Sequence, residues 1–400
     1  MTTVGEYYIL AKFGGQTIRV QVDTGSAITA VPLKECLSCP KGGLRYAKTL
    51  SRTGVAQTVG CNSILCNGHS CSPTTCGGCS TSGQCCALGS NQSCGFRVGY
   101  VDGSSAQGNI LIDEVQLVPG VRTTGQFGGI LSYTGNFQRA PVDGILGLAY
   151  SGLSCVPTCM TPIFDSYVKS RVVNKDMFAL CIEETSGALI LGGYDSSLGN
   201  TPVRWTQEAN ASGSSRNYYK VELGGGIEIA GLRVNLPDFN FGMLDSGTML
   251  IVMSTAAFNG IRSNLLTHHC NVPRLCQSPT WFSPASCIIL SNQDLRLLPV
   301  LKFSIGSVKV TLGPSDYMVK YTVGGVSYRC VGIHTLPSVS PVQVILGNVF
   351  MMPFIIVHDR QQHRIGIQKR RRSCQSYGQP PNSTIRTRAI TRVDGPGLGF

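Results

Sequence analysis

Long apolar segments and nucleophile motifs are both missing from this sequence. No uninterrupted apolar run reaches the roughly 18 residues that a membrane-spanning helix needs, so no transmembrane helix is predicted in this chain. The six His residues are scattered, and none stands with a Ser or Cys in a motif such as G-x-S-x-G. His268 and His269 precede Cys270, but no second cluster completes a metal site. The sequence thus predicts neither a Ser hydrolase nor a metal centre.

A signal peptide and an excess of acidic residues are missing too. Met1 to Thr3 lead almost directly into the strand-like segment Tyr7 to Ala11, as expected for a mature form or an incomplete gene product. The 21 Asp and Glu face 33 Lys and Arg, which leaves a formal charge of +12. Seven basic residues and one Asp from Lys369 onward contribute +6 of it. A basic tail could contact nucleic acid or membranes, but its composition favours a disordered segment over residues 370–400, and we expect no nucleic-acid partner.

Glycine, short apolar runs and cysteine are abundant. The 48 Gly among many short Val, Ile, Leu and Tyr runs predict an all-β chain with many turns. A chain of 400 residues can bury a large core and form two lobes. The 18 Cys indicate an oxidising compartment, and three glycosylation sequons agree with it, at Asn91, Asn210 and Asn382. We expect a protein that is secreted or resides in an endolysosomal or vacuolar lumen.

Two segments far apart in the chain share one pattern, an apolar strand followed by Asp-Ser/Thr-Gly-Ser/Thr. The first is Asp23-Thr24-Gly25-Ser26, and the second is Asp245-Ser246-Gly247-Thr248. The Gly lets the backbone turn tightly and direct N–H groups at the carboxylate. The hydroxyl of the fourth residue can donate to the Asp, and the second residue can bind backbone of the opposite loop. The duplication predicts two loops that face each other.

Facing loops would bring Asp23 and Asp245 into one site. Two carboxylates that share a site cannot both ionise easily, so one keeps a proton at mildly acidic pH. One acid and one base around a water can hydrolyse an amide without a covalent intermediate. A single Asp-Thr-Gly would be ordinary turn chemistry, and the second copy makes the hypothesis specific.

On these residues the sequence resembles the pepsin-like aspartic proteases, from about Glu6 to Gln368. Further segments match that family in the same order, namely Val142 to Tyr150, Leu189 to Asp195, Val344 to Phe350 and Val357 to Gly366. The resemblance implies an all-β, bilobal pepsin-like fold of two duplicated β-barrel lobes with the active-site cleft between them. The N-terminal lobe would cover residues 1–184 and the C-terminal lobe residues 185–369.

The resemblance also implies roles for residues around the two Asp. Residues 98–108 are similar to the family's flap, with Tyr100 at the Tyr position and Gly103 near the tip. Phe137 and Ile145 are expected to form apolar subsite walls. Ala30 stands where many family members have Trp, which is similar to the beta-secretase-like and plant nepenthesin-like branches.

Ten of the cysteines fall in a Cys-rich insertion at residues 36–94, which the nepenthesin-like branch also has. The pairs Cys36-x-x-Cys39 and Cys76-x-x-Cys79 could be zinc half-sites, but a secretory context favours disulfides of unknown connectivity. We expect a disulfide-stapled, helix-poor insertion without metal. The resemblance implies two further disulfides, Cys181–Cys374 at the lobe junction and Cys287–Cys330 in the second lobe.

The sequence therefore predicts an aspartic endopeptidase. Asp23 and Asp245 would activate a water, and protein or peptide substrates would be cut at apolar residues with an acidic pH optimum. The family resemblance further implies a monomer, a zymogen stage and no cofactor. The alternative is a catalytically weak or inactive binding protein on the same fold, such as the plant inhibitors of glycan-cleaving enzymes. Those proteins lose elements of the dyad, whereas this sequence keeps both Asp, both Gly and both hydroxyl residues.

Overall fold

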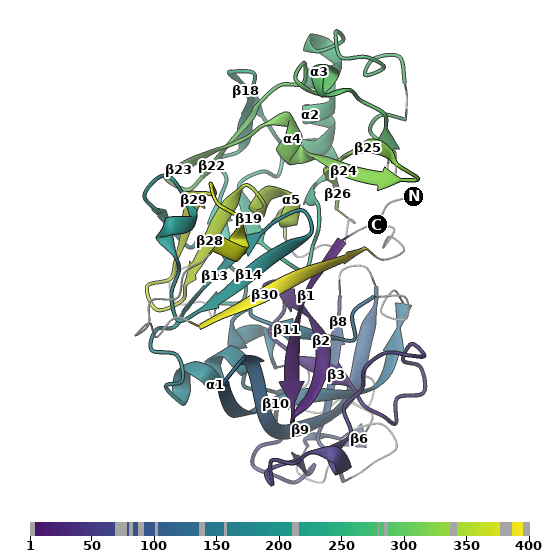
Figure 1. The fold of residues 1–400 in the computed structure, drawn as a ribbon, viewed down its shortest axis with the longest axis vertical. Coiled ribbons are helices and arrows are strands. Elements are labelled where there is room, and N and C mark those ends of the chain that lie inside the picture. Colours follow the sequence, from purple (N-terminus) through teal and green to yellow (C-terminus); the bar gives the residue numbers. More distant parts are fainter. Residues whose placement is uncertain are drawn as a thin grey trace.

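The computed structural model shows two lobes joined by a shared β-sheet (Figure 1). The predicted all-β, bilobal architecture is confirmed, because strands make up most of the regular structure. Phe137 and the Asn of all three sequons lie outside the described residues. The structure describes residues 5–68, 78–79, 83–86, 92–100, 103–135, 141–155, 158–209, 216–278, 280–283, 287–336, 342–376 and 386–394.

The largest sheet has 14 strands and contains segments from both halves of the chain. In spatial order, thirteen of its strands are β15 (Arg204–Gln207), β29 (Arg364–Lys369), β28 (Phe354–Asp359), β13 (Met177–Ile182), β14 (Ser186–Leu191), β30 (Arg386–Asp394), β1 (Gly5–Phe13), β2 (Gln16–Asp23), β11 (Gly144–Gly147), β3 (Ala30–Pro32), β10 (Val121–Thr134), β9 (Ser105–Val118) and β4 (Gln57–Thr58). The fourteenth strand, β8 (Gly95–Gly99), lies outside this order and pairs with β9. Its β1 and β2 form the predicted hairpin, which places Asp23 at a strand end.

The C-terminal lobe carries three smaller sheets. The five-stranded sheet has the order β16 (Lys220–Glu222), β19 (Phe241–Leu244), β27 (Val344–Leu346), β20 (Ile251–Met253) and β26 (Ile333–Thr335). The four-stranded sheet contains β18 (Leu232–Asn235), β17 (Gly226–Ile229), β22 (Leu301–Ile305) and β23 (Val308–Leu312). The three-stranded sheet contains β21 (Cys287–Ile288), β25 (Val326–Val331) and β24 (Met318–Val323). Two short ribbons in the N-terminal lobe pair β12 (Thr158–Cys159) with β5 (Asn67–Gly68) and β6 (Gly78–Cys79) with β7 (Cys85–Cys86).

Helices are few and short. The two longest are α1 (Ile163–Lys169) and α2 (Thr255–His268), and the Ser254 hydroxyl caps α2 by accepting from the Ala257 N–H at 3.1 Å. The remaining helices are α3 (Asn292–Leu295), α4 (Pro314–Tyr317) and α5 (Asn348–Met351). Among the described helices, none is both long and apolar enough to cross a membrane.

The two lobes repeat one arrangement of three strands. In the first lobe, β11 runs parallel to β2 with Gly147 beside Asp23, and it also contacts β3. In the second lobe, β27 runs parallel to β19 with Leu346 beside Leu244, and it is antiparallel to β20. The sequence forms these strands because Val, Ile and Leu fill them, as expected for buried strands. Each Asp loop thus emerges at the end of a strand that is held on both sides.

A single contiguous core of buried apolar side chains extends from one lobe to the other. Aromatic pairs mark its two ends: Phe13 and Phe127 lie 5.0 Å apart in the first lobe, and Phe303 and Phe350 lie 5.7 Å apart in the second. Such edge-on ring contacts are favourable beyond simple burial. The continuous core fixes the lobes, and with them the two Asp loops, relative to each other.

The expectation of a disordered basic tail is wrong for residues 386–394. They form β30, which is antiparallel to β14 on one side and to β1 on the other. Ile390 of this strand is 1% exposed and belongs to the core. Backbone hydrogen bonds to two strand edges do not depend on side-chain charge, which is why the composition misled the prediction.

The structure contains both disulfides that the resemblance implied, Cys181–Cys374 and Cys287–Cys330. In the Cys-rich insertion, Cys36 pairs with Cys39, so this CxxC is not a zinc half-site. Among the described residues, further bridges are Cys61–Cys86, Cys66–Cys94, Cys155–Cys159 and Cys270–Cys276. Among the described residues of the insertion, regular structure is limited to two-residue strands and a single turn of 3-10 helix.

Candidate active site

The two Asp loops meet between the lobes. Asp23 and Asp245 are both buried, with exposed fractions of 4% and 6%. A Cβ atom on Gly25 would lie 2.5 Å from Asp245 Oδ1, and one on Gly247 would lie 2.5 Å from Asp23 Oδ1. Each Gly therefore faces the carboxylate of the opposite loop at a distance that no larger residue allows. This reciprocal approach brings together the two carboxylates that the sequence predicted to share a site.

Each carboxylate is held by its own loop in the same way. Asp23 accepts from the Gly25 N–H at 2.8 Å on Oδ1 and from the Ser26 hydroxyl on Oδ2. Asp245 accepts from the Gly247 N–H at 2.8 Å on Oδ1 and from the Thr248 hydroxyl at 2.6 Å on Oδ2. The duplicated sequence thus produces two equivalent carboxylates in fixed orientations.

Thr24 and Ser246 tie the loops together across the lobe interface. The Thr24 hydroxyl donates to the Leu244 carbonyl at 3.0 Å and accepts from the Ser246 N–H at 2.9 Å. The Ser246 hydroxyl donates to the Val22 carbonyl at 2.7 Å and accepts from the Thr24 N–H at 3.1 Å. Because all of these groups are buried, the four bonds satisfy backbone that would otherwise be unpaired.

The electrostatics of the pair favour one retained proton. Burial raises the pKa of Asp23, and the negative charge of Asp245 raises this pKa further. Hydrogen bonds from Ser26 and Gly25 act in the opposite direction, but they are the smaller effects. Two protons on such a pair leave in coupled steps that belong to both groups. The site can therefore hold one carboxylic acid beside one carboxylate over a range of pH.

Backbone N–H groups that follow β11 and β27 hold the two Asp loops through hydrogen bonds. The Leu148 and Ala149 N–H groups, directly after β11, donate to the Asp23 and Ser26 carbonyls, each at 2.8 Å. In the second lobe, the Asn348 N–H donates to the Thr248 carbonyl at 2.8 Å. The Asn348 side-chain amide also donates to the Ser246 carbonyl at 3.0 Å. The Asn348 amide thus supports the loop without adding a charge.

The segment expected to be the flap is a tight hairpin between β8 and β9. The Tyr100 N–H donates to the Ser104 carbonyl at 2.9 Å, and the Gly103 N–H donates to the Tyr100 carbonyl at 3.0 Å. Gly103 has φ +79°, a conformation that favours Gly, and its exposed position marks the turn. Tyr100 is half-buried. Residues 101 and 102 lie outside the described residues.

The two predicted subsite residues have different outcomes. Ile145 lies in β11, opposite Gln21 of β2 and Ala30 of β3. It is only 3% exposed, so it presents little surface to a substrate in this conformation. Phe137 falls outside the described residues and stays a prediction. Ala30 is buried in a cluster with Phe96 of β8 and Tyr133 of β10, where its small side chain leaves room for these rings.

Sequence reasoning missed two residues near the carboxylates. Gln21 lies in β2 two residues before Asp23, and its side-chain amide donates to the Gly247 carbonyl at 3.2 Å. Tyr218 is half-buried, and its pKa is raised by burial and then by the negative charges of Asp245 and Asp23, so its phenol lies within electrostatic range of both. Gln21 shares the polar side of β2 with Thr17 and Arg19, so the alternating pattern of the strand did not single it out. No motif in the sequence around Tyr218 indicated a position near the two Asp loops.

An apolar surface accompanies Tyr218 in the second lobe. Met243, Val252 and Ile345 alternate with core residues along β19, β20 and β27, so they lie on the sheet face opposite the core. Partly buried side chains pack on them, namely Tyr218, Leu250, Leu336 and Val342. Met243, Val252 and Ile345 are themselves buried, so the apolar surface that this face offers comes from the partly buried side chains that pack on them. Among the described residues, no group of three His, Cys, Asp or Glu could hold a metal ion.

Comparison with known proteins gives one consistent family. A family model described as eukaryotic aspartyl protease matches residues 6–370. An aspartic protease of Phaffia rhodozyma is 26% identical over 368 residues, which is 89% of this chain and 74% of that protein. Pepsin A of Canis lupus familiaris is 29% identical over 276 residues, covering 68% of this chain and 65% of that protein. Cathepsin E of Aquarana catesbeiana is 27% identical over 278 residues, covering 68% of this chain and 64% of that protein.

Proposed function

The chain belongs to the eukaryotic aspartyl protease family, a family of aspartic-type peptidases, and we propose that it is an active endopeptidase with Asp23 and Asp245 as its catalytic residues. The observation that carries the proposal is the reciprocal packing of Gly25 on Asp245 and of Gly247 on Asp23, which leaves two buried carboxylates side by side. The matched portion spans about two thirds of the length of pepsin A and cathepsin E, at 65% and 64%.

In the proposed mechanism, one Asp of the pair carries the shared proton and the other is ionised, which the burial of the pair and its shared negative charge support. The ionised Asp takes a proton from a water as the water attacks the peptide carbonyl carbon. The protonated Asp donates its proton to the carbonyl oxygen, which gives a gem-diol. As the C–N bond breaks, the Asp that took the water proton passes it to the leaving nitrogen, and a gem-diol hydroxyl returns a proton to the other Asp. Ser26 and Thr248 keep the outer oxygens of both carboxylates in place.

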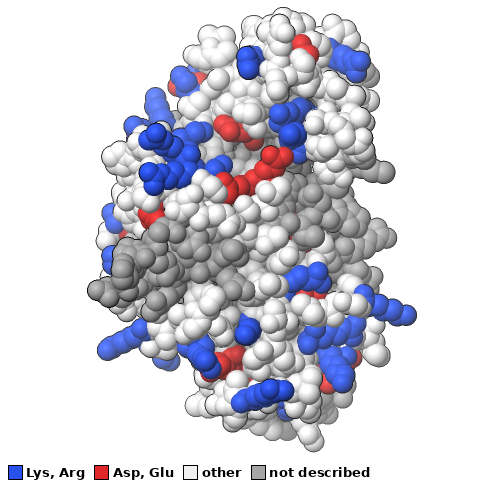
Figure 2. All heavy atoms as spheres, in the orientation of Figure 1, with Lys and Arg blue, Asp and Glu red and all other residues white. Residues whose placement is uncertain are grey.

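Substrates are proposed to be extended protein or peptide segments with apolar side chains near the cut. Support comes from the partly buried apolar side chains that pack on β19, β20 and β27, and from the charges of both Asp acting on the phenol of Tyr218, which is one of those side chains. Tyr100 is proposed to cover the substrate from the flap hairpin and to exclude water during the reaction. Figure 2 shows Lys and Arg on both lobes of the visible face, with Asp and Glu beside some of them.

The pH optimum is proposed to lie in mild acid. Activity needs the singly protonated pair, which exists only between its two proton losses. Because the pKa of Asp23 is raised, the remaining proton is held to higher pH, and the falling limb of the rate profile moves upward. A secreted or vacuolar location fits such an optimum. The seven disulfides seen among the described residues fit an oxidising secretory route.

The test is digestion of a peptide library across a pH series, with and without a statine-type transition-state mimic. We expect cleavage in acid that the mimic blocks. Asp23→Asn and Asp245→Asn should each lower the rate by at least about 1,000-fold and leave the circular dichroism spectrum unchanged, because an amide keeps the shape but cannot act as acid or base. A parent that binds the mimic but cuts no peptide would favour the binding-protein alternative. Substantial cleavage by either variant would refute the assignment of the dyad.

A further inference from the structure

The strands that lead into the two Asp loops differ at the position two residues before the Asp. Before Asp23, strand β2 carries Gln21 at this position. Before Asp245, strand β19 carries Met243. The side-chain amide of Gln21 can donate hydrogen bonds, whereas the thioether of Met243 has no donor. The two halves of the site, which otherwise repeat each other around the carboxylates, are therefore unequal here.

Gln21 lies on the side of β2 that faces away from the core. Side chains alternate along a strand, and the flanking Val20 and Val22 are buried in the core. Asp23 is on the same side as Gln21, since it follows two residues further along the strand. The Gln21 amide crosses to the other lobe and donates to the Gly247 carbonyl at 3.2 Å. A side chain of the first lobe thus holds the Asp loop of the second.

This contact reaches the second loop at a different place from the other bonds between the lobes. Thr24 binds that loop at the Leu244 carbonyl and at the Ser246 N–H. The amide from β2 acts further along, on the peptide plane between Gly247 and Thr248. Because a peptide group is planar, a bond to its carbonyl also orients its N–H. Thr24 therefore fixes the first half of the loop, and the amide from β2 fixes the second half.

The second half of the loop carries donors that orient the Asp245 carboxylate. The Thr248 N–H, in the same plane as the Gly247 carbonyl, donates to the Asp245 carbonyl at 3.3 Å. The Thr248 hydroxyl donates to Asp245 Oδ2 at 2.6 Å. Gly247 lies against the other carboxylate, since a Cβ atom on it would be 2.5 Å from Asp23 Oδ1. A rotation of this plane would therefore shift one carboxylate relative to the other.

We propose that Gln21 is a positioning residue for peptide hydrolysis, because it holds the peptide plane between Gly247 and Thr248 and, through it, the Asp245 carboxylate. This role rests on the proposed endopeptidase activity of the two Asp. Gln21 transfers no proton and acts only by keeping the pair in its reactive geometry. Displacement of a catalytic group by about 1 Å lowers a rate about 100-fold, and one neutral hydrogen bond restrains less than that. We expect the loss of this bond to lower kcat about tenfold.

The test is Gln21→Met in the full chain. Met has nearly the same length, lacks a donor and already stands at the matching position of the other strand, as Met243. Steady-state hydrolysis of a peptide at the pH optimum should show kcat about tenfold lower and KM changed less than about threefold. A side chain that only bound substrate would change KM instead. Unchanged kcat, or a loss confined to KM, would overturn the proposal.

Hydrogen exchange followed by mass spectrometry supplies a readout that needs no turnover. In Gln21→Met, the amides of residues 245–248 should exchange at least about fivefold faster than in the parent, because this loop loses a restraint. The amides of residues 23–26 should stay within about twofold of the parent. Equal changes in both loops, or none, would overturn the proposal. If the parent cut no peptide, the proposed activity would be refuted, and the exchange data would decide alone whether Gln21 holds the loop.

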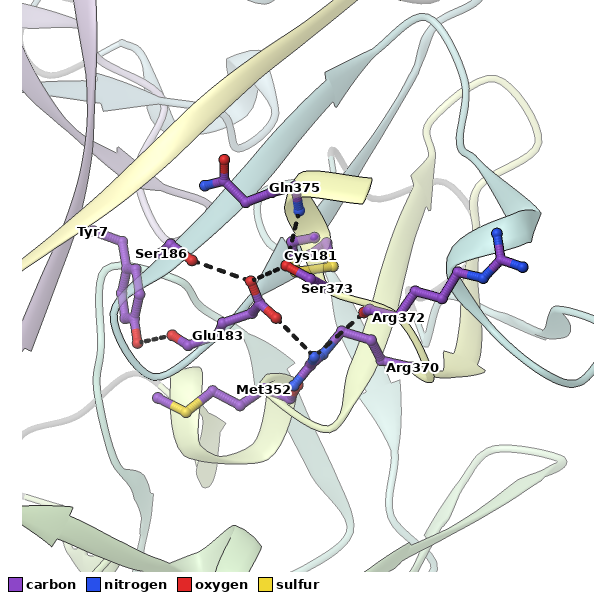
Figure 3. Close-up of a disulfide and its surroundings, with 10 residues drawn as sticks. Tyr7, Cys181, Glu183, Ser186, Met352, Arg370, Arg372, Ser373 and Gln375 are labelled. Carbon is purple, nitrogen blue, oxygen red and sulfur yellow. Dashed lines mark hydrogen bonds and ion pairs between the residues drawn. A yellow bond between two sulfur atoms is a disulfide. The ribbon is translucent and has the colours of Figure 1, made fainter. Parts of the chain in front are cut away.

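A matched control lies at the lobe junction, beside the Cys181–Cys374 disulfide. Figure 3 shows the Tyr7 hydroxyl donating to the Glu183 carbonyl, at 2.7 Å. This bond also joins a side chain to a main-chain carbonyl, but that carbonyl belongs to neither Asp loop. Tyr7→Phe should keep kcat within about twofold of the parent and leave the exchange of residues 245–248 unchanged, even where it lowers stability. A tenfold loss of kcat in this variant too would show that any bond lost near the junction slows the reaction, which would refute a specific role for Gln21.

Discussion

Gly25 lies so close to Asp245 that a Cβ atom on it would be 2.5 Å from the Asp245 carboxylate oxygen. The contact crosses the lobe interface, so the permitted separation of the lobes is set partly by the lack of a side chain at this position. We predict that Gly25→Ala lowers kcat at least about 100-fold, because displacement of a catalytic group by about 1 Å has an effect of that size. The measurement is steady-state peptide hydrolysis at the pH optimum.

A matched control is Gly60→Ala in the Cys-rich insertion. A Cβ atom there would meet only the Gln92 carbonyl oxygen at 3.7 Å, an ordinary contact. This variant should keep kcat within about twofold of the parent, as expected for a surface change away from the site. Parent-like kcat for Gly25→Ala, in a protein of unchanged spectrum, would mean that the loops tolerate separation and that their close approach is not needed for the reaction.

The Cys181–Cys374 disulfide closes a loop with a sequence separation of 193 residues, whereas Cys155–Cys159 closes one of 4. In the chain-entropy model, a loop of the first size stabilises by about 5 kcal/mol and the short one by about 2 kcal/mol. We predict that replacing both members of the long pair with Ala lowers the free energy of unfolding more than the same change in the short pair does. Urea denaturation of both double variants measures the difference, and equal losses would contradict the entropic account.

The sequence predicted the two Asp loops better than it predicted the surrounding residues and strands. The Asp loops could be predicted because all groups that orient Asp23 lie within three residues of it. Tyr218 could not, because its closeness to Asp23 and Asp245 arises only after the lobes fold together. The strand β30 was mistaken for a disordered tail, since its partners β1 and β14 supply backbone edges that leave no trace in the composition of residues 386–394.

His358 is fully buried between aromatic rings, with its ring centroid 4.5 Å from that of Phe178 and 4.4 Å from that of Tyr219. Burial, and then the positive charge of Arg360, lowers the pKa of His358 to about 3. Between pH 6.5 and about 3, the unfolded chain therefore binds a proton that the folded chain does not, and stability falls as the pH falls. The protein therefore loses stability in the acid range in which we propose that it works.

We predict that His358→Phe removes this loss, since Phe keeps the ring contacts and cannot take up a proton. The variant should gain roughly 3 kcal/mol in free energy of unfolding at pH 4 relative to its difference from the parent at pH 7.5. Chemical denaturation at the two pH values gives the comparison. His268→Gln, at an exposed position near the end of α2, is the control and should show no such gain. The same pH dependence in parent and His358→Phe would show that another group limits acid stability.

Glu208 of the C-terminal lobe accepts from the Tyr150 hydroxyl of the N-terminal lobe at 2.7 Å, and it also faces Arg216 at 3.7 Å. Arg360, held by Asp165 and Asp176, lies over the Tyr150 ring at 5.0 Å. Burial raises the pKa of Glu208 to about 7 despite the hydrogen bond from Tyr150 and the two Arg charges, which act to lower it, while Asp359 adds a smaller raising effect. The carboxyl group is thus kept protonated in acid at a contact between the lobes.

The folded chain binds the Glu208 proton up to about pH 7, whereas an unfolded Glu releases it near pH 4.5. Stability should therefore fall as the pH rises between these values, and the loss should be complete above pH 7. Glu208→Gln keeps an acceptor for Tyr150 and cannot ionise, so we predict that it removes roughly 3 kcal/mol of this loss, measured as the free energy of unfolding at pH 7.5 relative to pH 4.5. Glu228→Gln, which breaks only a surface pair with Lys302, is the control and should leave the pH dependence within a few tenths of a kcal/mol. If Glu208→Gln instead destabilised the protein equally at both pH values, the group would be a plain hydrogen-bond acceptor, and the decline toward neutral pH would have to originate in the Asp pair.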